Sequence, residues 1–162
     1  MKLERRARGR WVLRLLPQEK MLMLAVLPRY PLLPPEFHRL TKDEAHAAKL
    51  NHASQLLVEA HDKQRQQHRQ AVQTFLEDAS RFTEDEDGAL LSLGDDEVEW
   101  LLQVLNDIRM GSWARLGYPQ QREDGHYQSV ENLSKKNALD MLSIELCGAL
   151  QQQLLEILHP TD

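Results

Sequence analysis

The sequence contains one cysteine, Cys147, and no unbroken apolar run longer than seven residues. A single cysteine excludes an intrachain disulfide and is typical of a reducing compartment, so we expect a cytoplasmic protein with Cys147 packed in its core. The short apolar runs exclude a transmembrane helix. A Gly-rich phosphate loop, a nucleophile elbow and a dinucleotide fingerprint are also missing. We therefore expect no cofactor and no catalytic residues, and we interpret the chain as non-enzymatic.

Length and composition favour one globular domain over residues 1–162, with 41% hydrophobic and 28% charged residues. The net charge of −5 gives no global attraction to nucleic acid. The charge is nevertheless uneven along the chain. Residues 1–10 form a basic N-terminal arm, whereas residues 84–99 are strongly acidic. We expect these two segments to attract each other.

Two segments of the chain share one layout. WVLRLLPQEKMLMLAVL, residues 11–27, aligns without gaps on ALLSLGDDEVEWLLQVL, residues 89–105. Each begins with a Leu-x-Leu run typical of a half-buried strand, and an acidic first turn then opens a helix. The similarity is either an internal repeat or a chance likeness of two strand-to-helix turns. In both cases we expect residues 11–15 to pair with residues 89–93, because a lone strand leaves its backbone groups unpaired.

The remaining pattern is helical. Residues 11–40 are predicted to form a strand, a helix over 17–27 and a Pro-rich loop. Thr41 and Glu44 have capping-box spacing and begin a predicted long helix over residues 41–82. A strand and central helix follow over 89–117, and a C-terminal helix over 131–158. The expected fold class is mostly α: a single-domain helical bundle with one long helix and a small two-stranded β element.

The long helix carries a polar interruption in its apolar stripe. Between residues 61 and 70 there is no apolar side chain, and His61, Gln64 and His68 occupy the stripe positions. These residues predict either a polar layer, a solvated span or a pH-sensitive contact. His61 and His68 are about 10.5 Å apart along the helix axis, which is too far for a shared metal ion, so we expect no metal site. Because this helix is longer than a small core needs, it could also pair with a second copy in a homodimer.

The central helix contains the most distinctive stretch, WLLQVLNDIRMGSWARLG, from Trp100 to Gly117. On a helical wheel Arg109 faces the core, Asn106 lies at its margin and Asp107 points away. Arg109 either pairs with a carboxylate or with backbone carbonyls, or forms a site for an anion or a partner's carboxylate. Gly111 predicts the close approach of another helix. The candidate structural or partner-binding residues are Trp100, Asn106, Asp107, Arg109, Trp113, His61, Gln64 and His68.

This stretch, together with the strand-like LLSL and the acidic turn before it, resembles a bacterial domain-of-unknown-function family, numbered two thousand and seventeen. The resemblance is strongest from Gly88 to Gly117 and weaker over residues 11–27 and the last helix. It implies no established activity, cofactor or catalytic residue, and it points to small helical proteins that act through partners. We therefore expect an interaction or regulatory protein with a protein partner. The alternative is a transcription-linked regulator that contacts DNA or the transcription machinery through the basic N-terminal arm.

Overall fold

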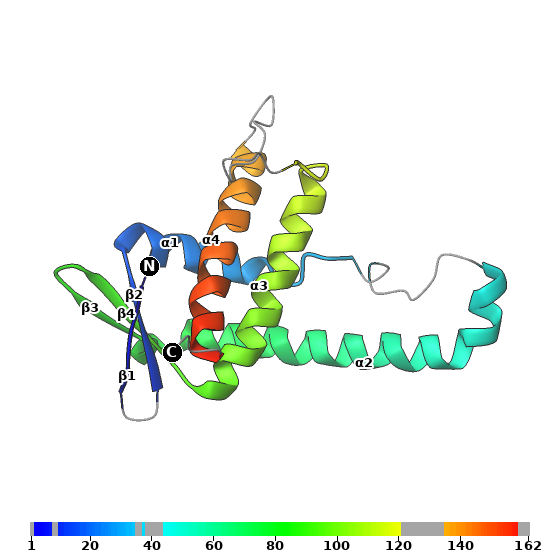
Figure 1. Ribbon diagram of the computed structural model, residues 1–162, viewed down its shortest axis with the longest axis horizontal. Helices are drawn as coiled ribbons and strands as arrows, with labels where there is room; N and C mark the ends of the chain where they lie inside the picture. The colour runs from blue at the N-terminus through cyan, green and yellow to red at the C-terminus, as the bar shows by residue number, and fades with distance from the viewer. Residues whose placement is uncertain (1, 8–9, 35–36, 38–43, 121–134, 159–162) are drawn as a thin grey trace.

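The computed structural model describes residues 2–7, 10–34, 37, 44–120 and 135–158, and these are mostly helical (Figure 1). The strands are β1 (Lys2–Ala7), β2 (Arg10–Leu15), β3 (Phe82–Asp85) and β4 (Gly88–Leu93). The helices are α1 (Pro17–Val26), α2 (Glu44–Glu77), α3 (Asp95–Arg115) and α4 (Lys135–Leu158). Short 3-10 helices follow α1 and α2: η1 (Leu27–Arg29) and η3 (Ala79–Arg81). None of the described helices is long and apolar enough to cross a membrane.

The strands form one antiparallel sheet of four strands in the order β1-β2-β4-β3. Its central pair has the predicted partners, with Leu13 opposite Leu91 and Leu15 opposite Ala89. The expectation of a two-stranded element is wrong, because β1 and β3 extend the sheet at its two edges. β1 lies within the segment expected to be a basic arm, where Leu3 is the one large apolar residue before the terminal alanine. Hydrogen bonding to β2 therefore orders a segment whose own composition gives little sign of a strand.

The sheet is nearly symmetric about its centre. The aligned residues Leu13 and Leu91 face each other, and Trp11 pairs with Leu93, the counterpart of Leu15. A local two-fold axis through the Leu13–Leu91 pair therefore relates the hairpin β1-β2 to the hairpin β3-β4, and each hairpin is followed by a helix. Of the two interpretations of the sequence similarity, this arrangement favours an internal repeat of a hairpin followed by a helix.

The two halves also begin their helices in the same way. The Glu19 carboxylate accepts a hydrogen bond from the Leu16 N–H at 2.8 Å, and Glu97 accepts one from the Gly94 N–H at 2.7 Å. Each bond satisfies a backbone donor that the start of a helix leaves unpaired. The backbone of Gly88, in the second hairpin, packs directly against Leu15 of β2. Its φ is +142°, and a Cβ there would lie 2.2 Å from the Leu15 carbonyl oxygen. Only glycine fits at that position.

The core lies on one face of the sheet, under α1, α3, α4 and the C-terminal turns of α2. Leu13, Leu15, Leu91 and Leu93 point into it and are fully buried. α3 and α4 lie side by side across it (Figure 1). Cys147 of α4 is also fully buried, as expected, and burial raises the pKa of its thiol to about 12. The thiol therefore packs as a small apolar group.

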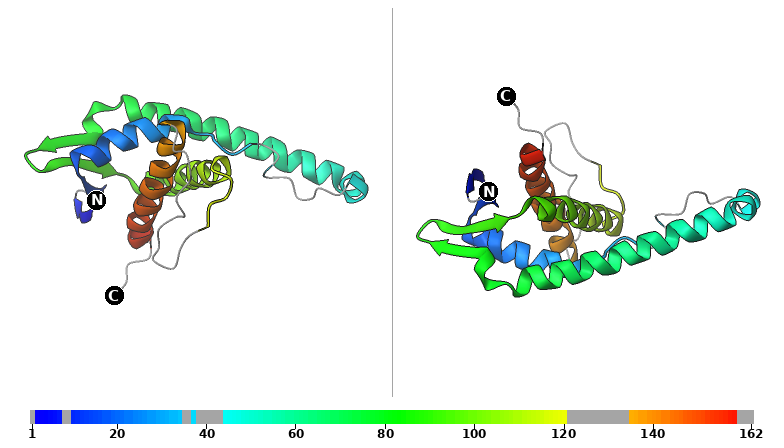
Figure 2. Two further views of the ribbon diagram at one scale, coloured as in Figure 1. Left: turned by 90° about the horizontal axis from the view of Figure 1, so that it is seen from above. Right: turned by 90° about the horizontal axis from the view of Figure 1, so that it is seen from below.

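α2 is the longest of the described helices; its C-terminal turns pack into the core through Val72 and Phe75, and its N-terminal half projects away from the core (Figure 2). It is continuous through residues 61–70 but ends at Glu77, before the predicted end at residue 82. It ends there because the Asp78 carboxylate accepts a hydrogen bond from the Ser80 N–H at 3.0 Å and begins η3. Phe82 then starts β3, although the predicted helix extends to residue 82. Thr41, the predicted start, lies outside the described residues.

A buried ion pair ties η1 to α4. The Arg29 guanidinium donates to the Asp140 carboxylate and, at 2.6 Å, to the Ser143 hydroxyl. Only 14% of the Arg29 side chain and 2% of the Asp140 side chain are exposed. Removing one partner leaves the other charge buried without compensation.

We expect Asp140→Ala to lower the free energy of unfolding by about 3–5 kcal/mol, because it leaves the Arg29 charge unpaired. Urea unfolding of the purified variant measures this loss. Glu145→Ala, on an exposed position of the same helix, should stay within about 0.5 kcal/mol of the wild type. Equal unfolding midpoints for Asp140→Ala and the wild type would contradict the assignment.

A polar groove between two crossing helices

A groove with a volume of about 400 Å³ opens where α2 crosses α3, and we call it the α2–α3 groove. Its volume lies at the lower end of the roughly 300–1,000 Å³ found for ligand sites. The segment after η1 contributes Tyr30 and Leu33. One wall comes from α2, with His61, Gln64, Arg65 and His68. The other wall comes from α3, with Leu102, Gln103, Asn106 and Asp107.

Asp107 fixes the segment that closes one side of the groove. Its Oδ1 accepts hydrogen bonds from the Leu32 N–H at 2.5 Å and the Leu33 N–H at 3.2 Å. The residue is 8% exposed, so the expectation that it points away from the core is wrong. A helical wheel shows only which residues of one helix share a face. It cannot show that the segment of Leu32 and Leu33 covers the face of α3 that carries Asp107.

Gly111 allows this segment to approach α3 closely. A Cβ at Gly111 would lie 2.7 Å from the Leu32 Cβ and 3.0 Å from the Leu32 carbonyl carbon. The expected close approach at this glycine is therefore present, but its partner is an irregular segment and not a helix. The missing side chain of Gly111 and the carboxylate of Asp107 together seat Leu32 against α3.

The polar interruption of α2 forms contacts with both neighbouring elements. The Gln64 side-chain amide donates to Gln103 Oε1 at 2.9 Å, which joins α2 to α3. Arg65 Nη2 donates to the Leu33 carbonyl at 2.5 Å, which joins α2 to the segment after η1. His68 packs against Tyr30, with 6.1 Å between ring centroids. Of the three interpretations of this stretch, these contacts favour a polar layer, and a groove lies beside it.

Burial changes the titration of two groups in the groove. Burial and the nearby Asp107 charge raise the pKa of Tyr30 to about 12, although the Arg65 and Arg69 charges oppose this change. The phenol therefore remains a neutral hydrogen-bond donor at physiological pH. Burial lowers the pKa of His68 below its ordinary value, so its imidazole is neutral at pH 7.

Five of the eight residues predicted from the sequence line the groove: His61, Gln64, His68, Asn106 and Asp107. The other three, Trp100, Arg109 and Trp113, lie elsewhere. Arg109 lies over Gly148 of α4 and donates to Gln151 Oε1 at 3.2 Å. This acceptor is a side-chain amide, in place of the carboxylate or backbone carbonyl that the sequence analysis expected. Arg109 therefore joins α3 to α4, away from the groove.

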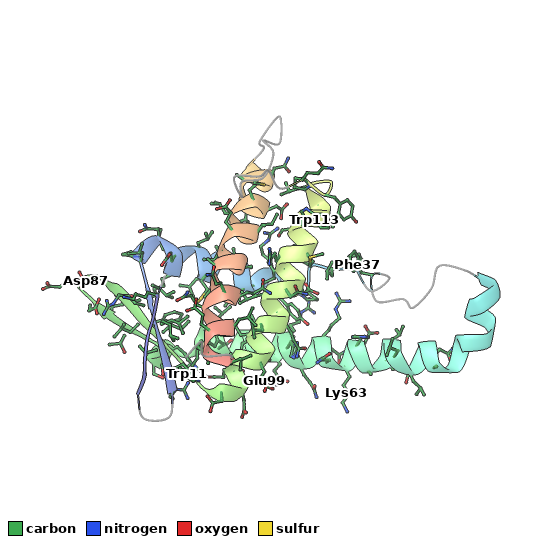
Figure 3. All side chains as sticks on the ribbon, in the orientation of Figure 1. Trp11, Phe37, Lys63, Asp87, Glu99 and Trp113 are labelled. Atoms are coloured by element: carbon green, nitrogen blue, oxygen red, sulfur yellow. The ribbon has the colours of Figure 1, made fainter. Side chains whose placement is uncertain are left out.

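The two tryptophans of α3 also lie outside the groove. Trp100 packs edge-on against Phe75 of α2, with 5.8 Å between ring centroids, beside a second cleft of about 360 Å³. Trp113 lies near the C-terminal end of α3, where its indole N–H donates to the Pro119 carbonyl at 2.9 Å (Figure 3). Both residues stabilise the ends of the helix and do not contact the groove.

Sequence reasoning missed Tyr30, Arg65 and Gln103 as groove residues. Arg65 lies inside the polar interruption, so its spacing from His61 and His68 was the one available signal. Tyr30 and Gln103 carry no such signal, because their place depends on which elements meet. Among the residues that the structure describes, no three histidine, cysteine, aspartate or glutamate side chains gather as a metal site would require.

A family model described as Domain of unknown function (DUF2017) matches residues 31–158. The matched range includes both helices of the groove and Leu33, but it begins one residue after Tyr30. No curated protein and no solved structure matches the chain.

We expect Asp107→Ala to lower the free energy of unfolding by about 2–4 kcal/mol, because two backbone N–H groups lose their acceptor. Urea unfolding measures the loss. The neighbouring Asn106→Ala, at an exposed position, should change it by less than about 0.5 kcal/mol. A similar small change in both variants would show that Asp107 does not hold the segment.

We also expect His68 to titrate below pH 6.5 in an NMR titration of its imidazole signals. The folded state then binds fewer protons than the unfolded state between the two pKa values. The stability that His68 contributes above pH 6.5 is therefore lost as the pH falls through its folded pKa. His68→Gln should lose less stability than the wild type on acidification through this range. A His68 pKa of 6.5 or higher would contradict the buried environment.

Proposed function

This chain belongs to the family described as Domain of unknown function (DUF2017), and we propose that it is a cytoplasmic, non-enzymatic interaction or regulatory protein. It acts by binding a protein partner, and the binding site is the α2–α3 groove. The description of the family names no activity, so the proposal rests on the chemistry of the groove.

The observation that carries the proposal is the set of open hydrogen-bonding groups in the groove. Gln64 and Gln103 use one donor and one acceptor between them, which leaves the Gln64 oxygen and the Gln103 amide N–H groups available. Asn106 adds an exposed carboxamide one turn away. Carboxamides offer both a donor and an acceptor, as a peptide unit does, so this wall suits a segment of polypeptide chain.

The projecting half of α2 adjoins the groove and extends the same surface. Leu56 and Val58 lie on this half and are 54% and 37% exposed. Exposed apolar side chains next to a polar groove are typical of a protein interaction surface. A second copy of the chain is one candidate partner for this half of the helix.

The structure favours this proposal over contact with DNA through the N-terminal arm. Residues 2–7 are hydrogen-bonded to β2 as a strand, and the Leu3 N–H also donates to Gln153 Oε1 at 2.7 Å. A segment fixed at the edge of a sheet lacks the freedom with which a basic arm follows a DNA groove.

Affinity capture of the tagged full chain from cell lysate, followed by mass spectrometry, tests the proposal. Asn106→Trp places a large side chain at the groove, and Glu99→Trp adds the same side chain at an exposed position two turns earlier on α3 (Figure 3). We expect the wild type and Glu99→Trp to capture the same partner. Asn106→Trp should lose about 90% of it or more, because one tenfold loss of affinity needs only about 1.4 kcal/mol.

Each captured partner is then purified and titrated against the three proteins, so that direct binding is measured. Circular dichroism establishes that both tryptophan variants fold. Sedimentation equilibrium distinguishes a second copy from a foreign partner by mass, since one chain is 18.8 kDa. Equal binding by all three proteins would show that the groove is not the partner site.

A further inference from the structure

We infer that the partner segment bound in the α2–α3 groove carries a carboxylate, which the Arg65 guanidinium and the Tyr30 hydroxyl hold together. The carboxamides of Gln103 and Asn106 bind the adjoining main chain. This inference rests on the proposed function and specifies the chemistry of its ligand.

Arg65 provides the positive charge. It is partly buried, and Nη2 donates to the Leu33 carbonyl, which fixes the guanidinium at the edge of the groove. An arginine has five N–H donors in a planar fork, and no other acceptor for Arg65 occurs among the described residues. Within the described residues the remaining donors are available, and a carboxylate matches them because it can accept two parallel hydrogen bonds.

Tyr30 is the second, independent observation. The residue is only 7% exposed, yet it lines the groove. Its hydroxyl makes no hydrogen bond within the part of the chain that the structure describes. The hydroxyl is not among the fully buried atoms that lack a partner, so it is open to the groove, where a ligand can accept its hydrogen bond.

Charges of both signs surround the groove. Asp107 is the one carboxylate among the lining residues, and its Oδ1 already accepts two backbone N–H groups. The Asp107 charge acts on the Tyr30 phenol more strongly than either arginine, and the Arg65 and Arg69 charges both oppose it. The attraction for a negative group therefore comes from direct contact with the Arg65 guanidinium, whose donors face the groove.

A carboxylate fits this site better than a phosphate. Phosphate groups in proteins are held by clusters of arginines or by helix N-termini. One arginine lines this groove, and its walls come from the interior of α2 and of α3. The planar fork of a single guanidinium matches the planar carboxylate.

NMR titration of the full-length protein with small probes tests the inference. The first probe is N-acetyl-glycylglycine with a free terminal carboxylate, and its matched control is the same peptide as a terminal amide. N-acetyl-aspartate α-amide presents only a side-chain carboxylate. Its comparison with the first probe distinguishes a side-chain carboxylate from a C-terminal one. Acetate and inorganic phosphate complete the set. The signals followed are the side-chain amides of Gln103 and Asn106 and the Nε–H of Arg65.

We expect at least one carboxylate probe to bind about tenfold or more tightly than the terminal amide, since a hydrogen bond to a charged group contributes at least that factor. Arg65→Gln should weaken binding by a similar factor, and Arg65→Lys should restore it only in part. Lys63→Gln removes the same charge from a side chain that points away from the groove and should have little effect (Figure 3). Tyr30→Phe keeps the ring packing and should weaken binding severalfold.

Three results would overturn the inference: equal affinity for the acid and amide peptides, tighter binding of phosphate, or equal losses in Lys63→Gln and Arg65→Gln. Its failure is distinct from that of the proposed function. If Asn106→Trp loses the protein partner but the acid and amide peptides bind equally, the carboxylate inference alone is wrong. If the acid peptide binds selectively but no partner depends on Asn106, the proposed function is wrong.

Discussion

The carboxylate of Asp107 determines how the two halves of the groove come together. The segment after η1 has no regular structure, so its backbone N–H groups need acceptors from elsewhere. One oxygen of Asp107 supplies acceptors for both Leu32 and Leu33. Because Leu33 is held there, its carbonyl is in place to accept from Arg65 of α2. Three elements that are distant in sequence are thus joined through one side chain, and the groove is the space left between them.

Glu97 has a comparable role at the other end of α3. It accepts from the Gly94 N–H, pairs with Arg10 of β2 at 2.8 Å and also pairs with Arg81 of η3. Burial raises the pKa of Glu97, but these hydrogen bonds and charges outweigh it and leave the pKa below its ordinary value. The Arg10–Glu97 pair is one contact of the expected kind between the basic and acidic segments. Through Arg10 and Arg81 together, Glu97 joins the start of α3 to β2 and to η3.

The local patterns predicted the centre of the fold well, because neighbouring residues determine them. The pairing of Leu13 with Leu91 and the start of α1 at Pro17 follow from short-range alternation and capping. The edge strand β1 could not be predicted, since it depends on a partner and its own residues are mostly charged. Only some of the groove residues could be predicted from the sequence. The polar interruption of α2 predicted His61, Gln64 and His68. Tyr30 could not be predicted, because it lines the groove only where the segment after η1 packs between α2 and α3.

The symmetric sheet has a consequence for the chain as it leaves the ribosome. The inner strand β2 is complete at Leu15, but the strand that covers its second edge ends at Leu93, 78 residues later. At roughly 5–20 residues per second this interval lasts about 4–16 s. During that time the first hairpin has an open row of backbone donors and acceptors and an apolar face without a core. The first half of the repeat therefore depends on the second for protection as well as for stability.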